Sequence, residues 1–129
     1  EINFFKEFRI SQNIKQINGS DLELNYVYKK ARCFIFPSLY EGFGLPLLEA
    51  MNMDCPVICS DTSCFSEVTN NAAAMFDPNN IENIIHEIEN VVYDEQKFSD
   101  LIIKGRNNIK NFSWQKCAEQ TLKVYNSIL

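Results

Sequence analysis

Apolar and polar residues follow two different periods along the chain, and the changes between them mark the expected elements. Three short apolar runs, at residues 33–36, 56–59 and 73–76, are typical of parallel strands buried on both faces. Each run ends at a proline or a polar loop, and proline in particular cannot donate to a central ladder. A fourth, short strand is expected at residues 14–17.

The segments between these runs carry apolar residues at helical spacing. Ser20 and Glu23 have the spacing of a capping box, which predicts a helix from about residue 21 to residue 31. Ser113 can cap the last helix, in which Trp114 and Tyr125 are expected to lie in the core. The other expected helices cover residues 1–8, 65–68, 81–92 and 98–109, and a further helix is expected to start near Leu45.

Strands that alternate with helices predict an α/β fold, a Rossmann-like parallel sheet flanked by helices. The 129 residues suit a single domain. A complete nucleotide-binding domain of this kind has about six strands. We therefore expect the chain to hold the later part of such a domain, without its opening strands.

Composition narrows the class of protein. The net charge is −5, and no basic run exceeds Lys29-Lys30, which argues against a nucleic-acid partner. No apolar run approaches the ~18 residues of a membrane span, and the polar start shows no signal peptide. The five cysteines are scattered and the only histidine, His86, is distant, so neither disulfides nor a metal site are expected. Reduced thiols favour the cytoplasm.

One segment, residues 38–50, points to chemistry. It follows an expected strand and enters an expected helix near Leu45, at the sheet edge where α/β proteins bind ligands. The glycines of Gly42-Phe43-Gly44 allow close backbone approach, and the helix start offers unpaired amides to a phosphate or to sugar oxygens. Glu41 and Glu49 could accept hydrogen bonds from vicinal hydroxyls. The alternative is a simple tight turn followed by an exposed helical glutamate.

The sequence of residues 36–51, FPSLYEGFGLPLLEAM, resembles the signature of the family 4 glycosyltransferases, in which two glutamates are separated by seven residues. The similarity continues at residues 55–61, 66–68, 72–78 and 112–114. The family consists of retaining enzymes of the GT-B fold, with two Rossmann-like domains. The resemblance implies that residues 1–129 are the later part of the C-terminal, nucleotide-sugar-binding domain, and that the acceptor domain is absent from this chain.

The resemblance also implies residue roles. Glu41 would act at the catalytic centre, beside the donor sugar and its hydroxyls, and Glu49 would hold the ribose hydroxyls. The backbone amides of residues 42–45 would face the sugar and the diphosphate; these residues are Gly42, Phe43, Gly44 and Leu45. Further residues that could contact the donor or support the site are Ser60, Asp61, Thr62 and Glu67. Tyr40, an aromatic beside a strand end, is expected to be a core residue instead.

For the complete protein, the resemblance implies transfer of a sugar from a nucleotide-sugar to a glycan or lipid-linked acceptor, with retention. It implies no cofactor and no metal, and a location in the cytoplasm or peripherally at the inner face of the membrane. The family's arginine and lysine pair, which neutralises the diphosphate, has no match here, so this chain alone is expected to be inactive. The alternatives are a stand-alone, non-catalytic nucleotide-sugar- or phosphate-binding module, and a sugar-nucleotide epimerase of the same fold.

Overall fold

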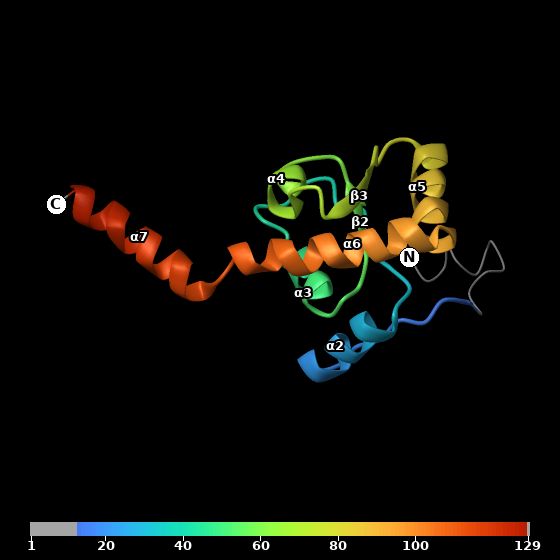
Figure 1. Ribbon diagram of the computed structural model, residues 1–129, viewed down its shortest axis with the longest axis horizontal. Helices are drawn as coiled ribbons and strands as arrows, with labels where there is room; N and C mark the ends of the chain where they lie inside the picture. Colours follow the sequence, from blue (N-terminus) through green and yellow to red (C-terminus); the bar gives the residue numbers. More distant parts are fainter. Residues whose placement is uncertain (1–12, 129) are drawn as a thin grey trace.

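The computed structural model describes residues 13–128, which form a parallel sheet with helices on both of its faces (Figure 1). The strands are β1 (Phe34–Phe36), β2 (Val57–Ser60) and β3 (Ala73–Phe76), in the order β1-β2-β3. Ile58 of β2 is paired with Ile35 of β1 on one side and with Ala74 of β3 on the other. The three strands expected after residue 30 are therefore confirmed, with limits shifted by one residue at most.

The helices also follow the sequence closely. Their bounds are α2 (Asp21–Lys30), α3 (Leu45–Asn52), α4 (Phe65–Thr69), α5 (Ile81–Tyr93), α6 (Glu95–Asn108), the 3-10 turn η2 (Ile109–Asn111) and α7 (Trp114–Ile128). At the start of α2, the Glu23 carboxylate accepts hydrogen bonds from the Ser20 amide and hydroxyl, at 2.8 and 2.9 Å. The Ser113 hydroxyl accepts from the Lys116 amide at 3.1 Å and so caps α7. The helix expected at residues 1–8 lies outside the described residues.

The core lies on both faces of β2, because side chains alternate along a strand. Val57 and Cys59 face the larger cluster, to which α3 contributes most of the helical residues, whereas Ile58 faces a smaller cluster with α5 and α6. The long helix α6 crosses the molecule beside α3 (Figure 1). Its Gly105 lets Met51 approach closely, since a Cβ there would lie 3.2 Å from Met51 Cγ. These contacts hold α3, and with it the loop that precedes α3, against the sheet.

Two expectations about strands are wrong. Residues 14–17 form no strand; Ile14 and Ile17 are 43% and 55% exposed. A strand needs a neighbour to accept and donate its ladder bonds, and this segment pairs with none of the strands in the described part of the chain. Ile35 of β1 is 37% exposed, so β1 is not buried on both faces. The reason is its position at the edge of the described sheet.

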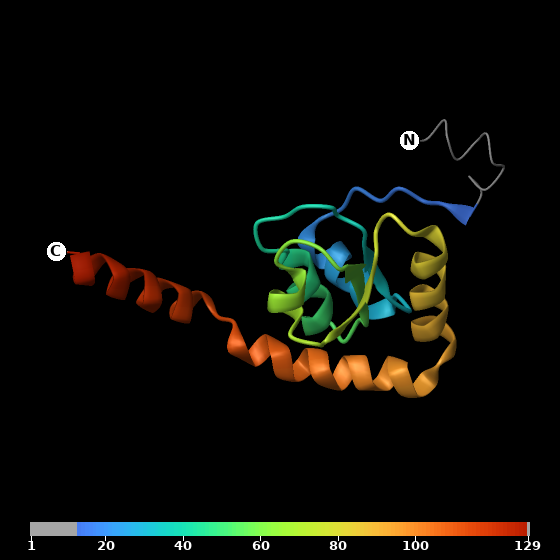
Figure 2. The same cartoon turned by 90° about the horizontal axis from the view of Figure 1, so that it is seen from above.

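The helix α7 leaves the rest of the molecule, and both views show it projecting from the end of α6 (Figures 1 and 2). None of its residues is buried, and Trp114 and Tyr125 are 78% and 63% exposed. The expectation that these two aromatics belong to the core is wrong, because helical spacing of apolar residues predicts an apolar face but not what covers it. Tyr40, also expected in the core, is exposed as well. No helix within residues 13–128 has the length and apolar content needed to cross a bilayer.

All five cysteines are free thiols, as expected. Burial raises the pKa of Cys55 to about 11 and that of Cys59 to about 12, whereas Cys117 is exposed on α7. The thiolate is the reactive form. We therefore expect an alkylating reagent at pH 8 to modify Cys117 rapidly and to leave Cys55 and Cys59 intact in the folded protein, as measured by peptide mass spectrometry. In denaturant all of these thiols should react, and equal labelling of Cys59 under native conditions would contradict the structure.

Candidate functional site

The segment between β1 and α3 forms a loop whose last position favours glycine. Gly44 is the N-cap of α3 and has φ = +89°, in the left-handed region that side chains disfavour. A Cβ on Gly44 would lie 3.1 Å from Leu47 Cδ1 and 3.2 Å from Phe65 Cε1. Pro46 occupies the first turn of α3, where its missing donor costs nothing. The strand, loop and helix order predicted from the sequence is therefore confirmed.

Four backbone amides at the end of this loop lack a hydrogen-bond partner among residues 13–128. These amides, of residues 42–45, donate no hydrogen bond there, and no side chain caps α3. They belong to Gly42, Phe43, Gly44 and Leu45. A Cβ on Gly42 would meet nothing within 4 Å, so this part of the loop faces open space. Unpaired donors at a helix start, together with the helix dipole, suit an anion or a cluster of hydroxyl oxygens.

Glu41 lies directly before these amides and is half-buried. The Ser38 hydroxyl donates a hydrogen bond to Glu41 Oε1 at 3.0 Å, which holds the carboxylate in one direction. Glu49 lies one turn into α3 and is exposed. Burial raises the pKa of the Tyr28 phenol, and the Glu49 carboxylate nearby raises it further. In the described part of the chain neither glutamate forms an ion pair, so both can accept hydrogen bonds from a ligand.

The loop after β2 lies beside this segment, since β1 and β2 are parallel neighbours whose carboxyl ends share one edge of the sheet. The Thr62 hydroxyl donates to the Ser38 carbonyl at 3.4 Å and joins the two loops. Ser60 is fully buried, so any effect on a ligand would pass through its neighbours. Asp61 and Glu67 are exposed, and the Asp61 amide donates to the Phe76 carbonyl at 2.7 Å. Contact of these four residues with a ligand stays a prediction.

Sequence reasoning missed two residues of this second loop. The Ser63 hydroxyl and the Cys64 thiol both donate to the Glu41 carbonyl, at 2.7 and 3.4 Å. No local pattern marks them, because the contact joins positions 22 and 23 residues apart. Their place directly after Thr62, at the same edge of the sheet, was the only available signal.

An apolar groove of about 480 Å³ adjoins the loop that carries the four unpaired amides, residues 42–45, which we call the amide loop. The Phe43 ring packs edge-on against Phe112, with ring centroids 5.8 Å apart. The groove runs between the start of α3 and the start of α7, and its lining residues are Phe43, Leu45, Leu48, Phe112, Ser113, Trp114 and Cys117. It gives the loop a hydrophobic border on one side.

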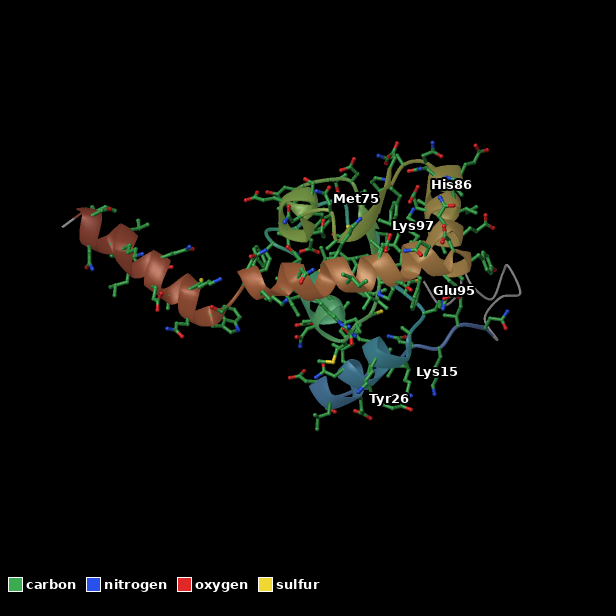
Figure 3. The ribbon with its side chains drawn as sticks, in the orientation of Figure 1. Lys15, Tyr26, Met75, His86, Glu95 and Lys97 are labelled. Atoms are coloured by element: carbon green, nitrogen blue, oxygen red, sulfur yellow. The ribbon has the colours of Figure 1, made fainter. Side chains whose placement is uncertain are left out.

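Neither His86 nor a group of metal-ligating side chains forms a second candidate site within residues 13–128. His86 is exposed on α5 at the periphery of the molecule (Figure 3), where it shares a hydrogen bond with Asn90 at 2.9 Å. It is therefore a solvated side chain and not part of a candidate site. From residue 13 to residue 128, no three histidine, cysteine or acidic side chains come close enough together to hold a metal ion. The absence of a metal requirement stays a prediction.

Comparisons with known proteins identify the family. The family described as "Glycosyl transferases group 1" matches residues 2–108. The chain is 40% identical over 105 residues to O-antigen chain mannosyltransferase B of Escherichia coli, covering 81% of this chain and 28% of that protein. It is 34% identical over 92 residues to the O-antigen chain mannosyltransferase RfbU of Salmonella typhimurium, covering 71% of this chain and 25% of that protein. The chain thus spans about a quarter of the length of these curated relatives.

A solved structure confirms the fold class. Sucrose-phosphate synthase from Thermosynechococcus elongatus superposes with a TM-score of 0.84 at 24% identity, over 98% of this chain and 33% of that one. The Rossmann-like sheet flanked by helices is therefore part of a GT-B fold, as the sequence predicted. The family match covers the strands, the amide loop and both glutamates. The chain belongs to the group 1 glycosyl transferases.

Proposed function

We propose that the complete protein is a retaining hexosyltransferase that moves a sugar from a nucleotide-sugar to a glycan or lipid-linked acceptor. Residues 1–129 would form the later part of its donor-binding domain. The observation that carries this proposal is the row of four unpaired amides beside the half-buried Glu41, in a chain of the group 1 family. Such a row binds oxygen-rich, negatively charged groups, and a nucleotide-sugar offers both phosphates and hydroxyls.

The arrangement suggests which group of the donor the amides and the two glutamates would each bind. The amides of residues 42–45 would donate to the diphosphate and the sugar, where no competing acceptor of residues 13–128 is present. Glu41, already directed by Ser38, would accept from hydroxyls of the transferred sugar. Glu49, exposed one turn further along α3, would accept from the ribose hydroxyls. Carboxylates accept two hydrogen bonds or more, which suits vicinal diols.

Mannose is the sugar that the comparisons favour. The two relatives above are named as O-antigen chain mannosyltransferases, and the match to the first reaches 40% identity. As part of the proposal, we infer that this protein also transfers mannose and that its acceptor is a polysaccharide. The same relatives suggest that the protein acts in the synthesis of a cell-surface polysaccharide. It would take its donor from the cytoplasm at the inner face of the membrane.

We propose that the reaction needs no metal and that the leaving diphosphate is stabilised by cations outside this chain. In the described residues the three ion pairs involve neither Glu41 nor the amide loop. Stabilisation of the leaving group supplies much of the rate in such transfers. The chain alone should therefore lack turnover. A transfer assay that shows turnover by residues 1–129 would contradict this part of the proposal.

The proposal is tested on the complete protein with a thermal-shift panel. The panel contains UDP-, GDP- and ADP-linked mannose and glucose, each at several concentrations. A ligand that binds only the folded state raises the melting temperature, so at least one nucleotide-sugar should stabilise the protein. Transfer of radiolabelled mannose to a glycan acceptor then separates the enzyme from a stand-alone binding module. No response to any donor would refute the proposed function.

We expect Glu49→Ala to weaken binding of the nucleotide half of the donor. Hydrogen bonds to charged groups contribute about 1.5–3 kcal/mol each, so the dissociation constant of the free nucleoside diphosphate should rise roughly 10- to 100-fold. Titration calorimetry on the complete protein measures it. Glu89→Ala is the matched control, since Glu89 is likewise an exposed helical glutamate but lies on α5. Equal affinities for both variants would remove the ribose role from Glu49.

A further inference from the structure

Ser63 has an unusual backbone conformation and a specific partner. Its φ is +56°, in the left-handed region that residues other than glycine rarely adopt. Its hydroxyl donates to the Glu41 carbonyl at 2.7 Å, across the gap between the loop after β2 and the loop after β1. The residue itself is exposed, so the conformation is not explained by burial of the side chain.

The Glu41 carbonyl belongs to the same peptide unit as the Gly42 amide. That unit is trans, since the described residues contain no cis peptide bond, and a trans peptide points its oxygen and its N–H in opposite directions. The hydrogen bond from Ser63 holds the oxygen toward the loop after β2. The Gly42 amide must therefore point away from that loop.

Without such a bond the Glu41–Gly42 peptide would rotate more freely. Gly42 has no side chain, and a Cβ there would meet nothing within 4 Å, so side-chain packing at Gly42 does not restrain this peptide. The Cys64 thiol adds a second, weaker donor to the same carbonyl at 3.4 Å. A carbonyl that accepts hydrogen bonds also polarises its own peptide, which makes the N–H a better donor.

We infer that Ser63 is a positioning residue, which orients the Glu41–Gly42 peptide so that the Gly42 amide donates to the bound donor. The inference rests on the proposed function and adds to it a residue that acts through the backbone of the site. It explains why a serine occupies a left-handed position that glycine would adopt more readily. A strained residue persists where its surroundings hold it, and here the hydroxyl supplies the contact.

The test uses Ser63→Gly in the complete protein, because glycine removes the hydroxyl and relieves the positive φ together. Because these four amides have no partner among the described residues, their exchange is measured with the nucleotide-sugar bound. We expect the bound donor to slow amide hydrogen exchange of residues 42–45 less in Ser63→Gly than in the wild type, and the melting temperature of the free protein to be unchanged or higher. The KM for the nucleotide-sugar should rise about five- to tenfold, as expected for one hydrogen bond, with a smaller change in kcat. The matched control is Asn71→Gly, at an exposed position with φ = +63° outside the site. This control should change neither the exchange nor the KM.

The outcomes separate the inference from the function on which it rests. If the bound nucleotide-sugar slowed the exchange of residues 42–45 equally in Ser63→Gly and in the wild type, the inference would be overturned, whatever the activity. A lower melting temperature with equal effects on exchange throughout the protein would also overturn it, because the role would then be structural. The proposed function fails independently if the wild-type protein responds to no nucleotide-sugar.

Discussion

Glu41→Gln in the complete protein is expected to lower kcat/KM for sugar transfer by about 100-fold. The half-buried carboxylate would accept charge-assisted hydrogen bonds from the donor sugar, each contributing about 1.5–3 kcal/mol, and the amide keeps a weaker acceptor and loses the charge. Two such bonds at the lower limit account for the factor of about 100. Steady-state kinetics with the donor found in the thermal-shift panel measure the effect.

The loss should come without unfolding. In the wild type the Ser38 hydroxyl donates to Glu41 Oε1 at 3.0 Å, and a glutamine oxygen can accept the same hydrogen bond. The melting temperature of the variant should therefore stay near that of the wild type. Glu89→Gln serves as the control, since it removes an equal charge from an exposed position on α5. If Glu41→Gln and Glu89→Gln had equal kcat/KM for sugar transfer, Glu41 would have no role in binding the donor sugar.

Gly44→Ala is expected to lower the free energy of unfolding by about 2–5 kcal/mol. A side chain at φ = +89° costs about 1–2 kcal/mol, and overpacking a core adds about 1–3 kcal/mol. The added methyl would crowd Leu47 and the Phe65 ring, at 3.1 and 3.2 Å. Both residues are fully buried, so they have little room to move. Denaturant titration of the complete protein, followed by a local probe on α3, measures the change.

Gly42→Ala is the matched control two residues earlier. A methyl there meets nothing within 4 Å, so stability should change little, but the methyl would enter the open space in front of the unpaired amides. We expect this variant to fold normally and to bind the nucleotide-sugar more weakly. Comparable stability of Gly42→Ala and Gly44→Ala would show that the left-handed turn at Gly44 does not hold the loop.

The elements that local patterns determine were predicted well. The strand at residues 73–76 and the helix start at Leu45 match the structure to the residue. Period, caps and prolines act within a few residues of the chain, so they are visible in the sequence. The expected strand at residues 14–17 failed because a strand depends on a partner, which no local pattern reveals. The exposure of Trp114 on α7 was likewise missed, because the apolar spacing of a helix does not reveal what covers its apolar face.

The sequence by itself determined the family, the fold class and the candidate loop, because the segment with two glutamates and two glycines is accompanied by similarity that continues to residues 112–114. It also suggested unpaired amides before Leu45, since a helix start leaves its first donors free.

Only the tertiary structure decided how that loop is held. The left-handed Gly44 packs against Phe65 of α4, and the Ser63 hydroxyl reaches the Glu41 carbonyl from the neighbouring strand's loop. Such contacts form when parallel strands bring their carboxyl ends to one edge, which depends on pairing between distant residues. The spacing of residues along the chain carries no record of these contacts.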